Sequence, residues 1–411
     1  MKVIVGLSSL ELGGSMISAI ELAASVQDQL GWEMAVYAPP GPASKLLAER
    51  GLRHIEAPGD VTGWSVPLYR NLRALDRLER PDVFHAWDWA LLGTSYYAMH
   101  LRNRPVMGSC TAMSVPSLLP WALPISFVTE EIRVQDQRRR GPSYLQEYPI
   151  NVRADDPATV DGAAFRTDLG VGPDQTLLVV VSRLARWMKR EGIARTIEVT
   201  ERLARDHDVV LAVVGDGDAR AELEALGTQV NQKLGRDVVR FTGAMVDPRP
   251  AYAAAQIGLG MGTSIVRGMA FGVPAIVLGE EGFSAIFDAD HAEMLCEQGF
   301  YGLGVAEGAN DRLEAQLLRF VNSPDTCTEL GQFCRQVVQR RFSVDVVARE
   351  LAERYRIVAS APIDRSRAVL ARAARDLLVV CAATPARRLV PDQIKFKLQR
   401  RHTTRQHLAI N

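Results

Sequence analysis

The sequence predicts an α/β protein built from two doubly wound, mainly parallel sheets. Short apolar runs alternate with segments of helical length, and turns rich in glycine follow several of those runs. The alternation begins at Lys2 and begins again at Thr176. At 411 residues the chain also exceeds the usual size of one domain. Each half of the chain is therefore expected to form its own α/β domain.

The first half has the pattern of strand, helix and strand that a parallel sheet requires. Gly31 stops the first helix, and Pro81 stops the third. Three strands are predicted at residues 2–7, 34–38 and 82–86, with helices at residues 16–30, 44–50 and 68–80.

Residues 111–168 have no clear periodicity and contain six prolines, which favours irregular structure. Within them, residues 148–168 resemble an interdomain connection. These observations predict a first domain over residues 1–165, a second over residues 170–345, and helices with a basic tail over residues 346–411.

The second half repeats the pattern, with strands expected at residues 177–181, 209–214 and 238–241 and helices from residue 191 and over residues 219–226. Its clearest unit is 257–288, in which a strand leads into the glycine turn 260–264, a helix, a Gly-Val-Pro break and a second strand. Such a turn before a helix N-terminus suits an anion. A tight turn without a ligand is the alternative.

The composition excludes several functional classes. The formal net charge is +0, so the whole-chain charge gives no reason to expect nucleic acid binding. The five cysteines show no CxxC and no spacing with histidine suited to zinc, a usage that fits a reducing cytosol with buried thiols. The start MKVIVGLSSL fits a first strand better than a signal peptide, and no apolar run approaches the roughly 20 residues of a membrane span. We therefore expect a cytoplasmic protein that is soluble or peripheral at the membrane.

The C-terminal region differs in charge from the rest. Residues 345–358 and 364–383 have helical periodicity. From residue 360 to the end there are eleven Lys or Arg and three Asp or Glu, about +8, which leaves about −8 elsewhere. A basic amphipathic tail can lie on an anionic membrane surface. A solvated C-terminus with one docked helix is the alternative.

Four turns of the second half follow strands that should end at one sheet edge, where ligands bind in open parallel sheets. Arg183 and Lys189 flank one of them and would offer fixed positive charge to a diphosphate. Ordinary surface cations are the alternative. The four turns are residues 182–189, 215–218, 243–245 and 260–264.

These residues also carry a family resemblance. The segments SRLARWMKREG, VVGDGDARAELEAL, VRFTGAMVDPRPAYAAAQIGLGMG and RGMAFGVPAIV, in this order, resemble the donor-side motifs of glycosyltransferase family 4, and RFSVDVVARELAERY resembles its closing helix. The family has the GT-B fold. The resemblance covers residues 176–355 densely and residues 2–38 more loosely.

The resemblance implies two Rossmann-like domains that face each other across a cleft, with a nucleotide-sugar donor on the second and a glycan, lipid or small-molecule acceptor mainly on the first. It implies that Arg183 and Lys189 hold the donor diphosphate and stabilise the leaving group. No metal and no cofactor beyond the donor would be needed. Other implied contacts are Gly13 and Gly14 to phosphate or acceptor, Gly215 and Gly243 to base and ribose, and Gly262, Thr263 and Ser264 to the donor phosphate.

Two departures from the family pattern bear on catalysis. Arg267 stands where the second of two donor-loop glutamates is expected, and the first falls near Leu259. Arginine cannot accept a hydrogen bond from a ribose hydroxyl, so Arg267 is expected to pair with a phosphate or with Glu280 or Glu281. Those two glutamates would otherwise restore sugar contacts or remain on a solvated loop.

The second departure is a missing histidine after the fourth strand of the first domain. The segment GSCT at residues 108–111 lacks it, and His85 is the candidate substitute. A structural histidine is the alternative. Trp87 and Trp89 would stack on a sugar or pack in the core.

The resemblance therefore implies a metal-independent, retaining glycosyltransferase that moves a sugar from a nucleoside-diphosphate donor to an acceptor hydroxyl. A catalytically degenerate protein that binds nucleotide or glycan is the first alternative, motivated by the missing glutamates and histidine. A GT-B sugar epimerase or phosphorylase is a more distant one.

Overall fold

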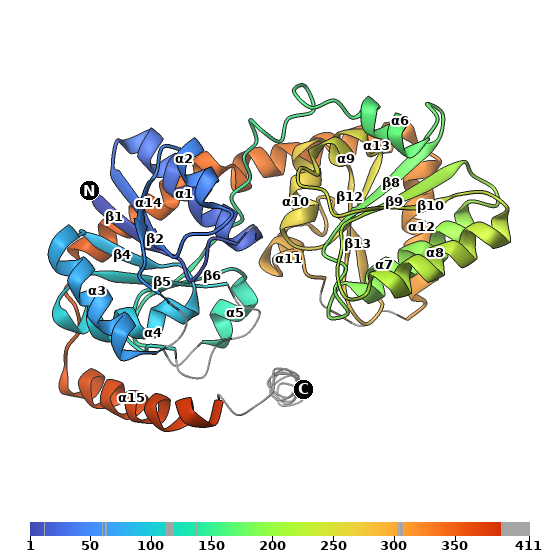
Figure 1. Ribbon diagram of the computed structural model, residues 1–411. Helices are drawn as coiled ribbons and strands as arrows, with labels where there is room; N and C mark the ends of the chain where they lie inside the picture. Colours follow the sequence, from blue (N-terminus) through green and yellow to red (C-terminus); the bar gives the residue numbers. More distant parts are fainter. Residues whose placement is uncertain are drawn as a thin grey trace. The chain divides into compact units, whose positions relative to one another are not determined.

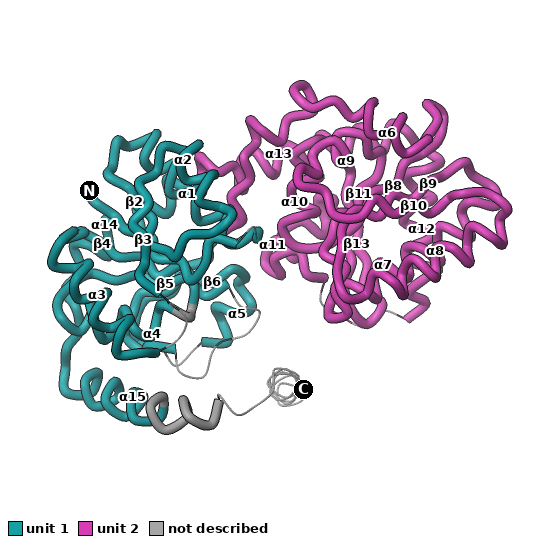
Figure 2. Tube along the Cα trace, viewed as in Figure 1, with its two compact units in different colours: residues 1–146, 348–411 teal, residues 147–347 magenta. Residues whose placement is uncertain are grey.

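The computed structural model describes residues 1–387 except residues 12, 60, 62–63, 112–114, 116–118, 137–138, 303 and 305–306. The chain divides into two compact units (Figure 2). Unit 1 comprises residues 1–146 and 348–411, and unit 2 comprises residues 147–347. The predicted pair of α/β bodies is present, and the fold class is confirmed.

Unit 1 contains a parallel sheet of seven strands in the order β3-β2-β1-β4-β5-β6-β7, with helices packed on it (Figure 1). The strands are β1 (Lys2–Gly6), β2 (Glu33–Ala38), β3 (Arg53–Glu56), β4 (Val83–Ala86), β5 (Val106–Cys110), β6 (Ile125–Phe127) and β7 (Ser143–Leu145). The helices are α1 (Gly14–Leu30), α2 (Ser44–Glu49), α3 (Val66–Glu79), α4 (Trp89–Ala98), α5 (Glu130–Gln135), α14 (Val344–Ser360) and α15 (Arg367–Arg387), with a 3₁₀ turn at His100–Arg102. Most of α14 belongs to this unit.

The central strands are apolar along their whole length because helices cover both faces of the sheet. In β1 the four residues from Val3 to Gly6 are buried, and all of β4 and β5 is buried. Continuous apolar runs, rather than alternating ones, therefore identified β1 and β4 in the sequence, whereas β5 was not predicted.

The interval 111–168 is more ordered than its prolines suggest, because it contributes β6, β7, α5 and α6 (Ala163–Leu169). Pro124 and Pro142 stand immediately before β6 and β7. Their carbonyl oxygens accept hydrogen bonds from the N–H groups of Gly108 (2.9 Å) and Ile125 (3.1 Å). Proline lacks only the donor, so at the start of a strand it still supplies an acceptor to the ladder.

Unit 2 contains a sheet of six strands in the order β10-β9-β8-β11-β12-β13, in which only the edge strand β13 is antiparallel. The strands are β8 (Thr176–Val181), β9 (Val209–Val214), β10 (Val239–Gly243), β11 (Ile257–Gly260), β12 (Ala275–Leu278) and β13 (Ser284–Ile286). Besides α6, the helices are α7 (Arg190–Leu203), α8 (Arg220–Leu234), α9 (Arg249–Ala254), α10 (Thr263–Ala270), α11 (Ala292–Glu297), α12 (Ala309–Val321) and α13 (Pro324–Val337), and a π-helical turn spans Val338–Phe342.

The division between the units falls after residue 146, whereas the sequence placed the first domain boundary at residue 165. The reason is that residues 147–162 pack on unit 2. Ile150 forms a bridge with Ser343, and the Tyr148 hydroxyl donates to the Gly299 carbonyl oxygen at 3.1 Å. The C-terminal helices, predicted as a separate part, belong to unit 1 from residue 348 onward.

Within the described residues, no helix is both long enough and apolar enough to cross a bilayer. The basic tail beyond residue 387 lies outside the described part of the chain.

Candidate functional site

The candidate site lies in unit 2, where β8, β9, β10 and β11 reach their carboxyl ends. The turns after three of these strands are linked by backbone hydrogen bonds. The Ser182 N–H donates to Val214 at 3.0 Å, and the Gly215 N–H donates to Gly243 at 2.9 Å. The predicted gathering of these turns at one sheet edge is therefore observed.

Glycine is required in the turn after β9. Gly215 has φ +141°, and a Cβ there would stand 1.8 Å from the Ser182 carbonyl oxygen. Gly217 has φ +158°, and a Cβ there would stand 2.4 Å from the Leu184 carbonyl oxygen. Any side chain at either position would separate the turns after β8 and β9.

Arg183 and Lys189, on the turn after β8, form a pair of neighbouring cations. Burial, and secondly the charge of Arg183, lower the pKa of Lys189 to about 8. Among the described residues neither cation has a carboxylate partner, whereas Arg186 and Arg190 nearby both pair with Glu222. Two close positive charges without a counterion form a site for an anion.

The backbone that carries Lys189 is strained and braced. Met188 has φ +64°, an uncommon value for a residue with a side chain, and its N–H donates to Glu280 at 3.2 Å. In return, Glu191 accepts from the N–H groups of Glu281 (3.1 Å) and Gly282 (2.8 Å). Glu280 therefore braces the cation turn here, a role that the sequence did not suggest.

The glycine turn before α10 lies beside the same cation. Gly262 has φ +64°, and its N–H donates to Phe300 at 2.8 Å. A Cβ on Gly262 would lie 3.3 Å from the ring of Tyr301, and the Lys189 ammonium lies 5.3 Å from the centre of that ring. Tyr301 thus joins the turn before α10 to Lys189. No motif in the sequence marked Tyr301.

Two of the predicted donor-loop residues are arranged as a compact helix start. Thr263 is the first residue of α10, and the Ser264 hydroxyl donates to the Met261 carbonyl oxygen at 3.1 Å. The N-terminal end of α10 carries partial positive charge, which adds to that of Lys189.

Arg267 is engaged elsewhere. Its guanidinium donates two hydrogen bonds to Asp155, at 3.0 and 2.8 Å, and lies 6.0 Å from the centre of the Tyr252 ring. The Asp155 side chain is 4% exposed. Arg267 therefore pairs with the segment that follows residue 146, and not with Glu280 or Glu281. Asp155 was missed because it lies 112 positions away in the chain.

Gly243 is less open than predicted. It has φ +75°, and a Cβ would lie 3.4 Å from the guanidinium of Arg220. Arg220 itself pairs with Asp216 at 3.1 Å and with Glu224 at 2.7 Å. The space beside Gly243 is thus bordered by a neutralised arginine.

In unit 1 the predicted residues fall into two environments. Gly13 and Gly14 stand at the start of α1, are exposed, and have no heavy atom of the described structure within 4 Å of where a Cβ would lie. Their backbone is accessible to a ligand. Close by, the Trp87 indole N–H donates to the Ser15 hydroxyl at 3.1 Å. The side chain of Trp89, at the start of α4, lies outside the described part of the chain.

His85 is fully buried in β4. Its Nδ1 lies 2.7 Å from the Tyr355 hydroxyl, and its Nε2 lies 2.9 Å from the Ser109 hydroxyl. Burial, and secondly the charge of Arg354, lower the pKa of His85 to about 3, so the ring is neutral at physiological pH. With both ring nitrogens engaged, His85 links β4, β5 and α14. This arrangement fits the alternative of a structural histidine rather than a substitute for the missing catalytic one.

Among the described residues, no group of three or more His, Cys, Asp or Glu side chains is arranged to hold a metal ion.

Comparison with known proteins agrees with this architecture. Residues 175–319 match the family model described as "Glycosyl transferases group 1". A search of curated protein sequences finds no match.

Among solved structures, a glycosyltransferase from Rickettsia africae has a TM-score of 0.68 at 15% identity over 88% of this chain and 99% of its own. HepE from Anabaena, solved with UDP, has a TM-score of 0.68 at 18% identity over 87% of this chain and 100% of its own. Sucrose-phosphate synthase from Thermosynechococcus elongatus has a TM-score of 0.61 at 18% identity over 88% and 100%. HepE has also been solved with UDP-glucose.

The fold and the cation-lined sheet edge define a two-unit GT-B protein. Residues 175–319, within unit 2, match the group 1 glycosyltransferase model, and the chain as a whole shares the GT-B fold of these structures.

Proposed function

We propose that this protein transfers a sugar from a nucleoside-diphosphate donor to an acceptor hydroxyl, and that the donor diphosphate binds Arg183 and Lys189. The observation that carries the proposal is that these neighbouring cations have no carboxylate partner among the described residues. Departure of a nucleoside diphosphate leaves negative charge on its phosphate, which fixed cations stabilise.

The charge state of Lys189 fits this role. Burial and a neighbouring arginine make its positive charge unfavourable in the free protein. A diphosphate between the two cations would remove that penalty. We propose that these cations and the start of α10 supply the positive charge at the leaving group, so that no metal and no separate cofactor is needed.

The finer assignments are proposals of the same kind. UDP and UDP-glucose, which the Anabaena protein HepE binds in its structures, are the first donors to test. We propose retention of the anomeric configuration, as the family resemblance implies, and an acceptor that is a glycan, lipid or small molecule reaching the open backbone of Gly13 and Gly14.

A catalytically degenerate nucleotide-binding protein is the second candidate. It is favoured by the ion pair of Arg267 with Asp155 and by the buried, fully engaged ring of His85. The family pattern provides a carboxylate at the position of Arg267 and an imidazole that is free to reach the sugar. Arg267 has no carboxylate, and both ring nitrogens of His85 are engaged.

A screen of nucleotide sugars by thermal shift, followed by a hydrolysis and transfer assay, separates the two candidates. The proposed function predicts stabilisation by at least one donor and release of its nucleoside diphosphate. Product NMR would then show whether the anomeric configuration is retained. Stabilisation without turnover over the full donor and acceptor panel would favour the degenerate protein, and no nucleotide binding at all would contradict both.

A further inference from the structure

The outer surface of α3 and α15 in unit 1 is unusually apolar. Of the eleven large apolar side chains that are exposed in the described part of the chain, five belong to these two helices. Val66 is 54% exposed and Leu378 is 72% exposed. Val66 lines one groove with Leu377 of α15, so the start of α3 lies beside α15, and exposed apolar side chains on such neighbouring elements mark a candidate interaction surface. The five are Val66, Leu78, Leu370, Leu378 and Val379.

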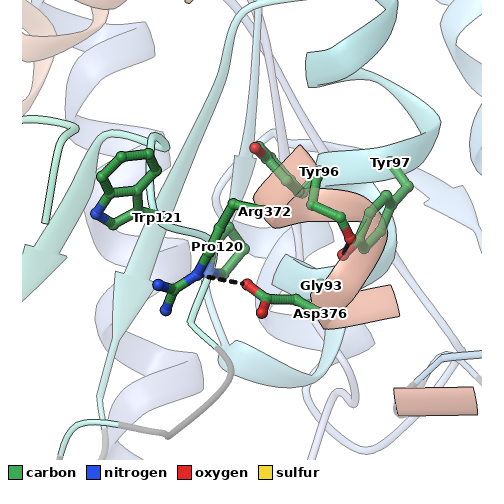
Figure 3. Close-up of a pocket in the computed structure, with 8 residues that line it drawn as sticks. Gly93, Tyr96, Tyr97, Pro120, Trp121, Arg372 and Asp376 are labelled. Atoms are coloured by element: carbon green, nitrogen blue, oxygen red, sulfur yellow. Dashed lines mark hydrogen bonds and ion pairs between the residues drawn. The ribbon is translucent and has the colours of Figure 1, made fainter. Parts of the chain in front are cut away.

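The inner face of α15 is already satisfied by unit 1. Figure 3 shows the contact, in which Arg372 and Asp376 of α15 lie beside tyrosines of α4. The Tyr97 hydroxyl donates to the Ala373 carbonyl oxygen at 2.9 Å, and Asp376 pairs with Arg372 at 3.2 Å. A cavity of only about 40 Å³ remains there. Val369, Ala373 and Asp376 of α15 are buried, so this face of the helix is covered by unit 1 and the exposed leucines lie on another face.

An apolar groove of about 370 Å³ lies between α3, α4 and α15. Trp64 forms an edge-on contact with Tyr97 at 5.4 Å between ring centres. Arg102 lines the groove and donates to the Tyr69 hydroxyl at 3.5 Å. The apolar and aromatic lining residues are Trp64, Val66, Tyr69, Tyr97, Leu101 and Leu377. An apolar lining with tryptophan, tyrosine and a cation suits the interface of a lipid bilayer.

The excess positive charge of this part of the chain favours a negatively charged partner. Residues 360–387 contain five Lys or Arg and two Asp or Glu, and the sequence from 360 to 411 contains eleven and three, although the whole chain is neutral. Arg70 of α3 and Arg367 of α15 are exposed on these helices. The exposed valines and leucines would gain nothing from contact with a polyanion such as nucleic acid, and two copies of the same basic region repel each other. A surface that is both apolar and negatively charged is an anionic membrane.

We propose that the α3–α15 surface binds a bilayer that contains anionic phospholipid, with an acyl chain in the groove lined by Trp64 and arginines at the phosphates. The inference stands apart from the proposed sugar transfer, because it uses no residue of unit 2. It assigns membrane contact to a defined helix face and groove of unit 1, whereas the sequence pattern suggested contact only through the basic C-terminal tail.

Sedimentation of the full-length protein with vesicles tests the proposal. We expect binding to vesicles of phosphatidylcholine with phosphatidylglycerol, and at least tenfold weaker binding to phosphatidylcholine alone. Leu378→Glu should weaken binding to the anionic vesicles at least tenfold. Val246→Glu, a matched change at a fully exposed valine of unit 2, should leave it unchanged.

Tryptophan fluorescence tests the groove itself. Vesicles with brominated acyl chains should quench the protein, and Trp64→Phe should remove part of that quenching while the circular dichroism spectrum stays the same. Equal vesicle binding by Leu378→Glu and wild type would overturn the proposal, as would quenching that Trp64→Phe does not change. A dimer that Leu378→Glu dissociates in the absence of vesicles would also overturn it, by making this surface a contact between copies.

Discussion

The two sheets end differently at their carboxyl edges, although the sequence patterns of the two halves are alike. In unit 2 the turn after β8 carries a strained Met188 and the cations Arg183 and Lys189, which have no carboxylate partner in the part of the chain that the structure describes. In unit 1 the residue singled out near the carboxyl end of β4, His85, is buried, neutral and hydrogen-bonded on both nitrogens. Unsatisfied charge and strain, rather than residue type, distinguish a binding site from a core.

The same contrast exists within unit 2. Arg267 lies in α10 and pairs with Asp155, whereas Lys189 has no carboxylate partner among the described residues. Arg267 thereby holds the segment after residue 146 to unit 2, whereas the Lys189 ammonium contacts the ring of Tyr301.

Arg267→Glu should be the most damaging change. It would place a second carboxylate beside the buried Asp155, and loss of one partner of a buried ion pair costs about 3–5 kcal/mol. Chemical denaturation should show a fall of that order in the free energy of unfolding. The control is the double variant Arg267→Glu with Asp155→Arg, which should recover part of the loss. Wild-type stability in the single variant would show that the pair is not structural.

His85→Ala should reduce stability without affecting nucleotide binding. It removes a buried side chain and leaves the hydroxyls of Tyr355 and Ser109 without their partner, for about 2–4 kcal/mol. Denaturation and a nucleotide titration on the same sample separate the two effects. If nucleotide sugar is turned over, kcat should stay within a few-fold of wild type. A thousandfold loss of kcat in a folded variant would make His85 catalytic after all.

Donor affinity should fall as pH rises above about 8. The pKa of Lys189 is about 8 in the free protein, so its amine is protonated and positively charged below that pH and loses the charge above it. A bound diphosphate stabilises the ammonium and raises the pKa, so affinity drops by up to about tenfold per pH unit until the raised pKa is reached. Nucleotide titrations between pH 7 and 9.5 measure this dependence. Lys189→Arg remains charged throughout and should abolish it. A flat profile in wild type would exclude Lys189 from the site.

Tyr301→Leu should have the smallest effect. It removes the ring beneath the Lys189 ammonium, a contact worth about 0.5–2 kcal/mol, and so should weaken nucleotide binding by a few-fold to about tenfold. Tyr301→Phe keeps the ring and serves as the control, since it should bind nearly as well as wild type. Equal losses in both variants would assign the effect to the hydroxyl instead.

Much of the fold was predictable because it depends on local patterns. Buried parallel strands appear as continuous apolar runs, and β1, β2, β4, β8 and β9 were placed to within a residue or two. The strands β6 and β7 were missed because each has only three residues and follows a proline. Runs that short carry no periodicity to detect.

The residues of the candidate site were predictable only where local sequence places them at the ends of strands. Arg183, Lys189 and the glycines lie at strand ends, and the order of strands along the chain brings those ends together. Tyr301 and Asp155 were missed because their partners, Lys189 and Arg267, are 112 positions away in each case. The burial of His85 depends on Tyr355, 270 positions away. Contacts of this kind are set by tertiary packing and leave no signal in one sequence.

The most direct test of the account is a calorimetric titration of UDP, with GDP and ADP alongside, into wild type, Arg183→Ala and Lys189→Ala. A hydrogen bond to a charged group contributes about 1.5–3 kcal/mol, so each variant should bind the preferred nucleotide roughly 10- to 100-fold more weakly. Arg186→Ala, which removes an exposed arginine that already pairs with Glu222, should bind within about twofold of wild type. Unchanged affinity in both Arg183→Ala and Lys189→Ala would contradict the assignment of this sheet edge as the donor site.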